Sequence, residues 1–305
     1  MKIRRINYLI GYILILLMVE FSVKMGNHHL ILPEFAVLCV GVLALQEAHW
    51  IVNPFKIVLM PSITAILGFS INLLKIDYLF KIYLVILIML VVLKIANSKL
   101  APSFATGLLP IVTNTSHWYF ILVVVGMTSI LMLGVLLSGS YKNIQNPIKS
   151  LERDAMRQYL EILLLWIILV HLLGVDMMIA IPPVLVLLLE VIQKEHYPVN
   201  VFLKQVIILT GIAYLSMGVH QLISNDVIYI SMMMPLILII LKMFRIQLPA
   251  VYAFPLLILV IPTPMTQQLG LYTLFASGFS LGCVYILKKY SLKERLIHIV
   301  KRVIN

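Results

Sequence analysis

The chain has 305 residues, of which 62% are hydrophobic and only 11% charged, and its formal net charge is +11. Together with a mean hydropathy of +1.07, this excludes an ordinary soluble domain, in which about a quarter of the residues are charged. The basic residues lie in short segments beside apolar stretches, at both ends and near the middle of the chain. That distribution favours membrane loops over nucleic-acid binding.

Ten apolar stretches of roughly 15–22 residues recur along the chain, each long enough to cross about 30 Å of hydrocarbon as a helix. We therefore predict an all-α, polytopic helical membrane protein of the plasma or inner membrane, with at least ten membrane helices. The expected spans are Tyr8–Met25, His29–Leu45, Phe55–Leu74, Tyr78–Ala96 and Trp118–Ser138 in the first half, and Gln158–Gly174, Met177–Ile192, Val201–Val219, Val227–Met243 and Gln268–Leu287 in the second.

Two shorter, proline-bearing apolar stretches, Leu100–Val112 and Leu248–Ile261, precede the last span of each half. If both cross the membrane, each half has six crossings, and the termini and the central linker share one side. If both are re-entrant, each half has five crossings and the basic linker faces outward, against the positive-inside rule. We favour six crossings, with the N- and C-termini cytoplasmic.

The two halves repeat each other. Residues 46–55 align with residues 193–202 without a gap, with identical Gln, His, Val, Asn and Phe, and the same separation of 193 − 46 = 147 carries Pro102 onto Pro249. Polar and aromatic matches in loops are costly to obtain by chance, so we predict two parallel repeats of about five to six membrane helices each. The expected division is a first repeat at 1–139, a cytoplasmic linker at 140–157, a second repeat at 158–287 and a cytoplasmic tail at 288–305.

Three segments resemble the HPP family of integral membrane proteins. They are Leu32–Ala36 (LPEFA), Asn53–Val58 (NPFKIV) and Lys99–Leu109 (KLAPSFATGLL). The His-Pro-Pro triad that names the family is Leu100-Ala101-Pro102 in the first half and Gln247-Leu248-Pro249 in the second, so only the last proline is retained. The resemblance implies a tandem pair of family units. Some relatives are regarded as transporters of small anions such as nitrite, which implies a permease.

Prolines within apolar stretches are the first candidates for a substrate pathway, because broken helices at membrane depth usually surround a cavity. The alternative is a packing kink, since proline is common in membrane helices. The pathway candidates of this kind are Pro33, Pro102 with the following Ser103 and Thr106, Pro182 and Pro249.

Glu34 directly follows Pro33 in an apolar stretch, where a carboxylate costs roughly 3 kcal/mol unless it is paired or hydrated. It could take up a proton or bind a coupling cation. Alternatively, it snorkels to the interface or is held neutral by a neighbour. Glu190, His171 and His220 lie toward span ends and are interpreted as interface anchors.

The repeated polar turns supply the remaining candidates, Gln46, His49 and Asn53 in the first half and Gln193, His196 and Asn200 in the second. One interpretation is a substrate vestibule or anion gate made of neutral hydrogen-bond donors. The other is turn formation, in which asparagine starts a bend and the neighbouring aromatic residue settles at the interface.

No nucleotide, metal or hydrolase signature accompanies these residues, so no catalytic residue, metal or cofactor is assigned and the chain is not expected to be an enzyme. Residues 291–305 have the spacing of an amphipathic helix drawn to anionic inner-leaflet lipid. The expected partners are the bilayer, a small solute and a second copy of the chain, with no nucleic acid.

Three functions remain open on the sequence. The first is a permease or secondary transporter of a small solute, with the site where the repeats meet. The second is a non-transporting membrane module, such as an assembly partner or sensor. The third is an intramembrane enzyme that uses Glu34 or a histidine. A seam between the halves that is sealed by aliphatic side chains would count against the permease.

Overall fold

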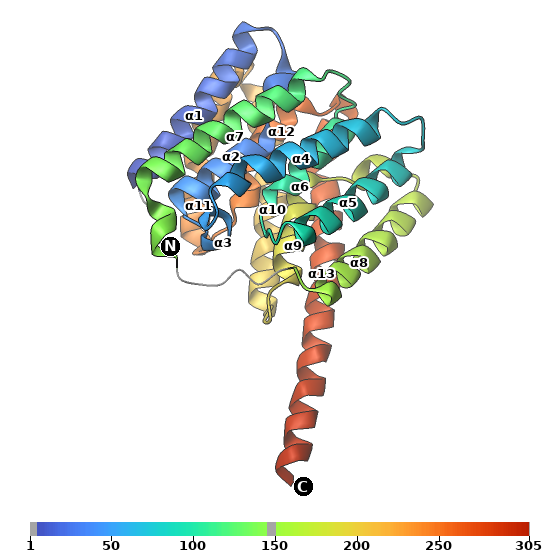
Figure 1. The fold of residues 1–305 in the computed structure, drawn as a ribbon. Helices are drawn as coiled ribbons and strands as arrows, with labels where there is room; N and C mark the ends of the chain where they lie inside the picture. The colour runs from blue at the N-terminus through green and yellow to red at the C-terminus, as the bar shows by residue number, and fades with distance from the viewer. Residues whose placement is uncertain (1–4, 145–150, 305) are drawn as a thin grey trace.

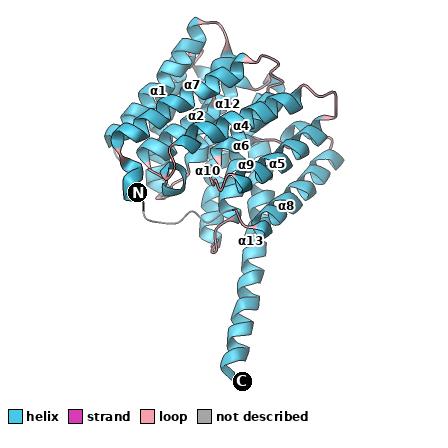
Figure 2. Cartoon of the chain, viewed as in Figure 1, coloured by secondary structure: helices cyan, strands magenta, loops and turns pink. Residues whose placement is uncertain are grey.

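The computed structural model describes residues 5–144 and 151–304, and the regular structure in these residues is entirely helical (Figures 1 and 2). The first half contains α1 (Arg5–Lys24), η1 (His28–Leu30), α2 (Pro33–Leu38), η2 (Cys39–Ala44), α3 (Ala48–Ile51), α4 (Phe55–Asn72), α5 (Tyr78–Ile95), α6 (Pro102–Val112), α7 (Tyr119–Ser138) and η3 (Ser140–Asn143). The second half contains α8 (Arg153–Leu172), η4 (Asp176–Met178), α9 (Pro182–Ile192), α10 (Val199–Leu222), α11 (Asp226–Phe244), η5 (Pro249–Tyr252), α12 (Ala253–Val260) and α13 (Thr263–Ile304).

Eight helices of the described chain are long and apolar enough to cross a bilayer: α1, α4, α5, α7, α8, α10, α11 and α13. Each exposes several large hydrophobic side chains, as expected where lipid replaces water. The predicted fold class, an all-α polytopic helical membrane protein, is confirmed.

Four further helical segments are short and almost wholly buried: α2 with η2, α6, α9, and η5 with α12. Each begins at one of the four prolines singled out in the sequence. Two of these segments were predicted as single helical spans, His29–Leu45 and Met177–Ile192, but in each the long helical run begins only at the proline. That they cross the membrane stays a prediction. The residues before Pro33 and Pro182 are extended, because proline disfavours helical geometry in the residue that precedes it, so each helix begins late.

The long helices surround the short ones (Figure 1). Around the outside, α4 packs against α5 and α7, α5 against α8, α8 against α13, α13 against α10, α10 against α11, and α11 against α1. In the middle, α2 packs against α6, α12 and η5, while α6 packs against α9 and α9 against η5. The four short segments therefore form the centre of the bundle, and we call them the central helices.

Contacts between the halves occur in matching pairs. Both halves have the order long, short, long, long, short, long, so α1 corresponds to α8, α2 to α9, α5 to α11 and α6 to η5–α12. Among the outer helices, α5 meets α8 and α11 meets α1; among the central helices, α6 meets α9 and α12 meets α2. Each contact thus has a counterpart with the roles of the halves exchanged.

The closest approach of a central helix to a long helix occurs between α6 and α4. A Cβ atom added to Gly68 would collide with the backbone of Gly107, and one added to Gly107 would collide with the sulfur of Met89 and the carbonyl of Thr64. Small residues allow two membrane helices to pack backbone to backbone, which brings dispersion contacts that lipid cannot replace.

The linker and the tail differ in part from their expected bounds. Helix α8 begins at Arg153, inside the range 140–157 predicted as linker. The last apolar span ends at Tyr290, close to the predicted Leu287. The helix itself continues as one helix of 42 residues, and its end projects from the bundle (Figure 1). The side chains of 291–305, on which the prediction of an amphipathic face rests, lie outside the described residues.

Candidate functional site

A cavity of about 400 Å³ opens at the end of the bundle where η2 and α9 end and α6 and η5 begin, which we call the linker face. Its size is in the range of small-molecule sites. Its lining combines charged, polar and aromatic side chains from both halves: Glu47, His49, Trp50, Lys99, Glu190, Gln193, Lys194, Gln247 and Pro249. We call it the linker-face cavity.

The first half contributes a sharp turn after the central segment α2–η2. The π-helical turns of η2 end at Ala44, and Gln46 takes a left-handed conformation with φ of 52°. The backbone N–H of Glu47 then donates to the carbonyl of Gly41 at 2.9 Å, which directs the chain back over the helix. The ring of Trp50 occupies the space that a side chain at position 41 would fill.

The second half contributes the end of α9. Gln193 follows the last residue of α9, and its Nε2 donates to the carbonyl of Leu189 at 2.7 Å. Glu190 lies one turn earlier, with its Oε1 buried and without a hydrogen bond. Glu190 was interpreted from the sequence as an interface anchor, but it forms part of the cavity wall instead, since the C-terminal turn of α9 points toward the cavity.

The charges of the cavity are coupled across the two halves. Lys194 attracts both Glu47 and Glu190, and these two carboxylates repel each other. Burial raises the pKa of the Glu47 carboxyl above its ordinary value, and Lys194 lowers it in part. Burial, assisted by the positive charge of Lys99, lowers the pKa of His49. The cavity therefore presents positive and negative groups side by side.

The backbone ends of the central helices add to this mixed potential. At the linker face α6 and η5 begin, whereas η2 and α9 end. The start of a helix carries partial positive charge and its end partial negative charge. Lys99 precedes α6, and Lys194 follows α9, so one lysine strengthens a positive end and the other offsets a negative end.

A second cavity, of about 430 Å³, lies at the opposite end of the bundle, which we call the far face. It too is lined by both halves, by Asn72, Ile76, Tyr78, Lys81, Ile111, Val112, Asn114, Asp176, Met177, Pro262 and Met265. Lys81 Nζ donates to the carbonyl of Asn72 at 2.7 Å, and Asn72 Nδ2 donates to the carbonyl of Thr115 at 3.0 Å. These bonds tie the ends of α4, α5 and α6 together.

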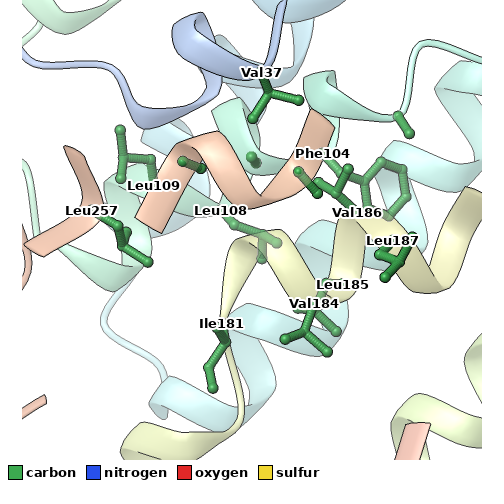
Figure 3. Close-up of a cluster of buried hydrophobic side chains, with 14 of the residues drawn as sticks. Val37, Phe104, Leu108, Leu109, Ile181, Val184, Leu185, Val186, Leu187 and Leu257 are labelled. Carbon is green, nitrogen blue, oxygen red and sulfur yellow. The ribbon is translucent and has the colours of Figure 1, made fainter. Parts of the chain in front are cut away.

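Between the two faces, the central helices meet through aliphatic and aromatic side chains (Figure 3). We call this layer the seam; it includes Val37 of α2, Phe104 and Leu108 of α6, Val184 of α9, and Leu257 of α12, all of them buried. Hydrocarbon side chains offer no partners to a dissolved solute. The seam is therefore closed in this conformation, which counts against a permanently open channel.

One carboxyl group is buried inside the bundle. Glu34, in the first turn of α2, is 2% exposed, and neither of its oxygens has a hydrogen-bond partner among the described residues. It faces the hydroxyl of Thr106 on α6. Snorkelling to the interface is thereby excluded for this conformation.

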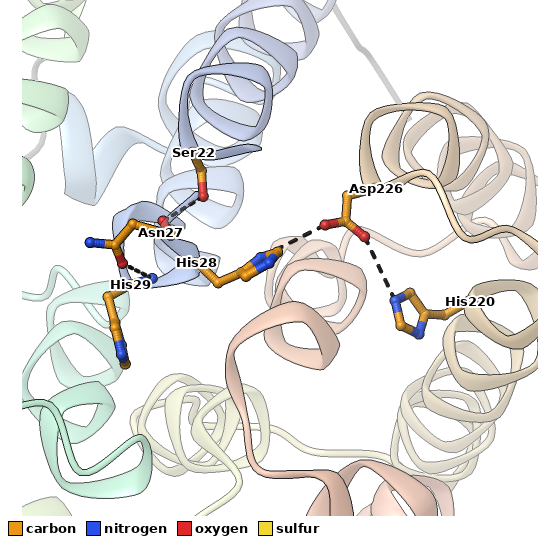
Figure 4. A network of polar contacts seen from close by, with 6 residues as sticks. All are labelled: Ser22, Asn27, His28, His29, His220 and Asp226. Atoms are coloured by element: carbon orange, nitrogen blue, oxygen red, sulfur yellow. Dashed lines mark hydrogen bonds and ion pairs between the residues drawn. The ribbon is translucent and has the colours of Figure 1, made fainter. Parts of the chain in front are cut away.

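A polar network joins the halves at the far face (Figure 4). Asp226, at the start of α11, lies 3.7 Å from Nδ1 of His28 and 3.8 Å from Nε2 of His220. Asn27 holds the neighbouring turn, since its Oδ1 accepts from the backbone N–H of His29 at 3.0 Å. His220, interpreted as an interface anchor, thus also contacts the acidic start of α11.

The structure brings together only some of the predicted site residues. His49, Gln193 and Pro249 line the linker-face cavity, and Gln46 forms the turn beside it. Pro102, Ser103 and Thr106 are buried in α6, Pro33 and Pro182 start central helices, and Asn53, His196 and Asn200 do not line either cavity. His196 and Asn200 are exposed.

Sequence reasoning missed the charged residues of the cavity. Glu47 and Lys194 occupy corresponding positions 147 residues apart inside the repeated turn, but they differ in charge and so gave no match. Lys99 is the first residue of the segment that resembles the HPP family. A search for charged residues next to the repeated positions would have found all three.

No family model, no curated protein and no solved structure matches this chain. The fold itself defines the class: the chain is a polytopic helical membrane protein with eight long apolar helices among its described residues. The likeness to the HPP family stays a prediction.

Proposed function

We propose that the protein is a membrane permease for a small charged solute, which binds in the linker-face cavity and passes the seam when the two halves rearrange. The observation that carries this proposal is the composition of the cavity: matching segments of both halves place charged side chains at the end of the central helices. Transporters with internal repeats bind their solutes where the repeats meet, near broken helices.

The matched contacts between halves support a parallel repeat related by an axis along the membrane normal. Such an arrangement allows one half to rock against the other without breaking its own packing. The closed seam then corresponds to a conformation in which neither face is connected to the other. Solute passage requires the aliphatic layer of Figure 3 to part.

We infer that the linker face is cytoplasmic. By the direction of the helices, most described basic residues near helix ends lie at this face, whereas Lys24, Lys75 and Lys81 lie at the far face. The linker-face group is Lys56, Lys94, Lys99, Lys142, Arg153, Arg157, Lys194, Lys204, Lys242, Arg245, Lys288 and Lys289. Cytoplasmic loops carry the excess of lysine and arginine, so both termini belong to that side.

A solute with an anionic group fits the cavity best. The start of α6, with Lys99 before it, offers positive potential, while Lys194 faces the two carboxylates that would otherwise repel an anion. The resemblance to the HPP family points the same way. The carboxylates would in turn bind a positive group, so a small amino acid is included in the substrate class.

The test is uptake by the purified protein in liposomes. Potassium nitrite, formate, acetate and glycine are the solutes, with glycerol as a neutral comparison. We expect uptake of at least one charged solute, reduced about tenfold by Lys194→Gln, a loss of about 1.4 kcal/mol in solute binding. Lys242→Gln makes the same change on an exposed lysine outside the cavity and should leave uptake unchanged.

The closed seam favours one other function, a non-transporting membrane module. In that case the aliphatic layer is permanent packing, and the cavity is a docking site for another subunit. Absence of uptake for every solute in the panel, together with a partner that copurifies and is released by Lys194→Gln, would favour the module and contradict the permease.

A further inference from the structure

Glu34 has a property that the linker-face cavity does not explain. A charged carboxylate removed from water costs several kcal/mol unless cations or donors surround it. Both Glu34 oxygens lack a hydrogen bond, and the side chain is only 2% exposed. The site thus disfavours the charged carboxylate. A neutral carboxylic acid can remain there, because only its single O–H group lacks an acceptor.

The helices packed around Glu34 supply no counter-charge. Central helices α6 and α12 contain no ionisable side chain, η5 contributes Tyr252, and η2 contributes Cys39. The polar groups that face the carboxyl are the backbone N–H of Glu34 itself and the hydroxyl of Thr106 on α6. These two neutral groups do not supply a positive charge, so in the absence of a cation a proton is the ligand that neutralises the carboxylate at least cost.

The long helices that touch α2 do not change this result. On α1, Tyr8 donates to the carbonyl of Met234 at 2.8 Å and Tyr12 to that of Ser231 at 3.1 Å, both toward α11. Glu20 and Lys24 of α1 pair with each other at 2.8 Å on the exposed surface. On α7, Tyr119 accepts a hydrogen bond from Asn27 at 2.9 Å.

The position of Glu34 links its proton to the seam. It stands in the first turn of α2, a central helix that packs against α6 of its own half and α12 of the other. If the halves separate at α2 and α12, water reaches the Glu34 carboxyl, and hydration lowers the free-energy cost of its charged form. When the halves close again, water is excluded and the Glu34 carboxylate must bind a proton to remain buried.

We propose that Glu34 is a proton-binding site that is occupied while the seam is closed and releases its proton when the seam opens. The proton leaves the carboxyl oxygen for water, and the carboxylate takes it back before closure. This inference rests on the proposed permease for its role in a transport cycle, but the site itself exists independently of any solute.

The test is infrared difference spectroscopy of the purified full-length protein in lipid nanodiscs, without added solute. We expect a C=O band of a protonated carboxylic acid at about pH 6 that disappears as the pH is raised to about pH 9, the range in which buried glutamates titrate. Glu34→Gln should remove the Glu34 component of this band, Glu34→Asp should shift that component, and Glu190→Gln, a change in the other buried carboxyl, should leave it in place. Glu20→Gln, a change in an exposed ion pair, should leave it unaltered.

Three titration results would overturn the proposal: no titrating band in the wild-type protein, an unchanged spectrum in Glu34→Gln, or a Glu34 band that persists unchanged to about pH 9. Exchange of the band in heavy water should take longer than the exchange of an exposed acid, and immediate exchange would also contradict it. Melting curves establish that each variant is folded. If the wild-type protein shows the Glu34 band but takes up no solute, the proposed permease is contradicted and the proton-binding site is not.

Discussion

The two halves of the molecule share an order of helices but enclose different interiors. In the first half, Gly68 and Gly107 bring α4 and α6 into backbone contact. The residues 147 positions later are Leu215 and Phe254, whose side chains require a wider separation. Likewise, the central helix with Glu34 has a counterpart in which Pro183 follows Pro182. The two halves therefore share the order of their helices, but they differ in how closely those helices pack and in which buried residues can ionise.

The glycine contact gives the largest expected effect. Gly68→Ala should lower the free energy of unfolding by roughly 1–3 kcal/mol, because the new methyl group meets the backbone of Gly107 and neither helix can yield easily. Thermal unfolding of the purified protein measures this change. Gly126→Ala on α7 is the matched control, since nothing lies within 4 Å of a Cβ at that position. Equal melting temperatures would show that the first half is no more tightly packed here than elsewhere.

A charge exchange between the halves tests whether Glu47 and Lys194 form one cavity. Lys194→Glu should destabilise the protein by about 1 kcal/mol, because three carboxylates then face one another. Adding Glu47→Lys restores an opposite charge and should recover part of that loss. A double-mutant cycle on thermal stability gives the coupling. Additive effects of the two changes would mean that the turns do not meet as described.

Glu47 also predicts a dependence of stability on pH. Because burial raises the pKa of its carboxyl, the folded state binds the proton more tightly than the unfolded chain. The contribution of Glu47 to stability is therefore fully present below its ordinary value of 4.5 and is lost as the pH rises through the folded pKa. Glu47→Gln should remove this loss, so its melting temperature should rise relative to the wild type by up to about 3 °C between about pH 4 and about pH 8. Parallel curves would contradict the assignment.

The smallest effect is expected at the far face, where Asp226 joins the halves through two histidines. Asp226→Asn should destabilise the protein by at most about 1 kcal/mol, because the contacts that it removes are long, at 3.7 Å and 3.8 Å, and partly exposed. Asp77→Asn is the comparison: Asp77 caps α5 by accepting from the N–H of Leu79 at 2.9 Å, with no histidine in that contact. A loss for Asp226→Asn no larger than that for Asp77→Asn would mean that the histidine contacts add nothing to stability.

Local patterns in the sequence predicted much of the fold. Hydropathy located the eight long helices to within a few residues at most ends, since lipid exposure leaves a continuous apolar signal. The prolines located all four central helices. Their length was misjudged at Pro33 and Pro182, because the apolar residues before each proline are extended rather than helical. The π-helical turns of η2 left no signal in the composition.

The candidate site was less predictable. The repeated turns indicated where a vestibule could form, and His49 and Gln193 do line the cavity. The juxtaposition of Glu47, Glu190 and Lys194 depends on how α9 and η2 end relative to each other, which periodicity along one helix cannot specify. Closure of the seam likewise depends on how the four central helices pack against one another, which the sequence of any one helix does not specify. Glu34 was found from the sequence because a carboxylate in an apolar stretch is itself unusual.

The uninterrupted course of α13 has a mechanical consequence. At about 1.5 Å per residue, its 42 residues extend for roughly 60 Å, about twice the hydrocarbon thickness. Within the bundle the same helix packs against α8, α9 and α10. Because the helix is long, a small tilt of α13 against those helices would produce a larger displacement at its C-terminal end. A fluorescent dye attached there would report a tilt of α13 without occupying the proposed solute cavity.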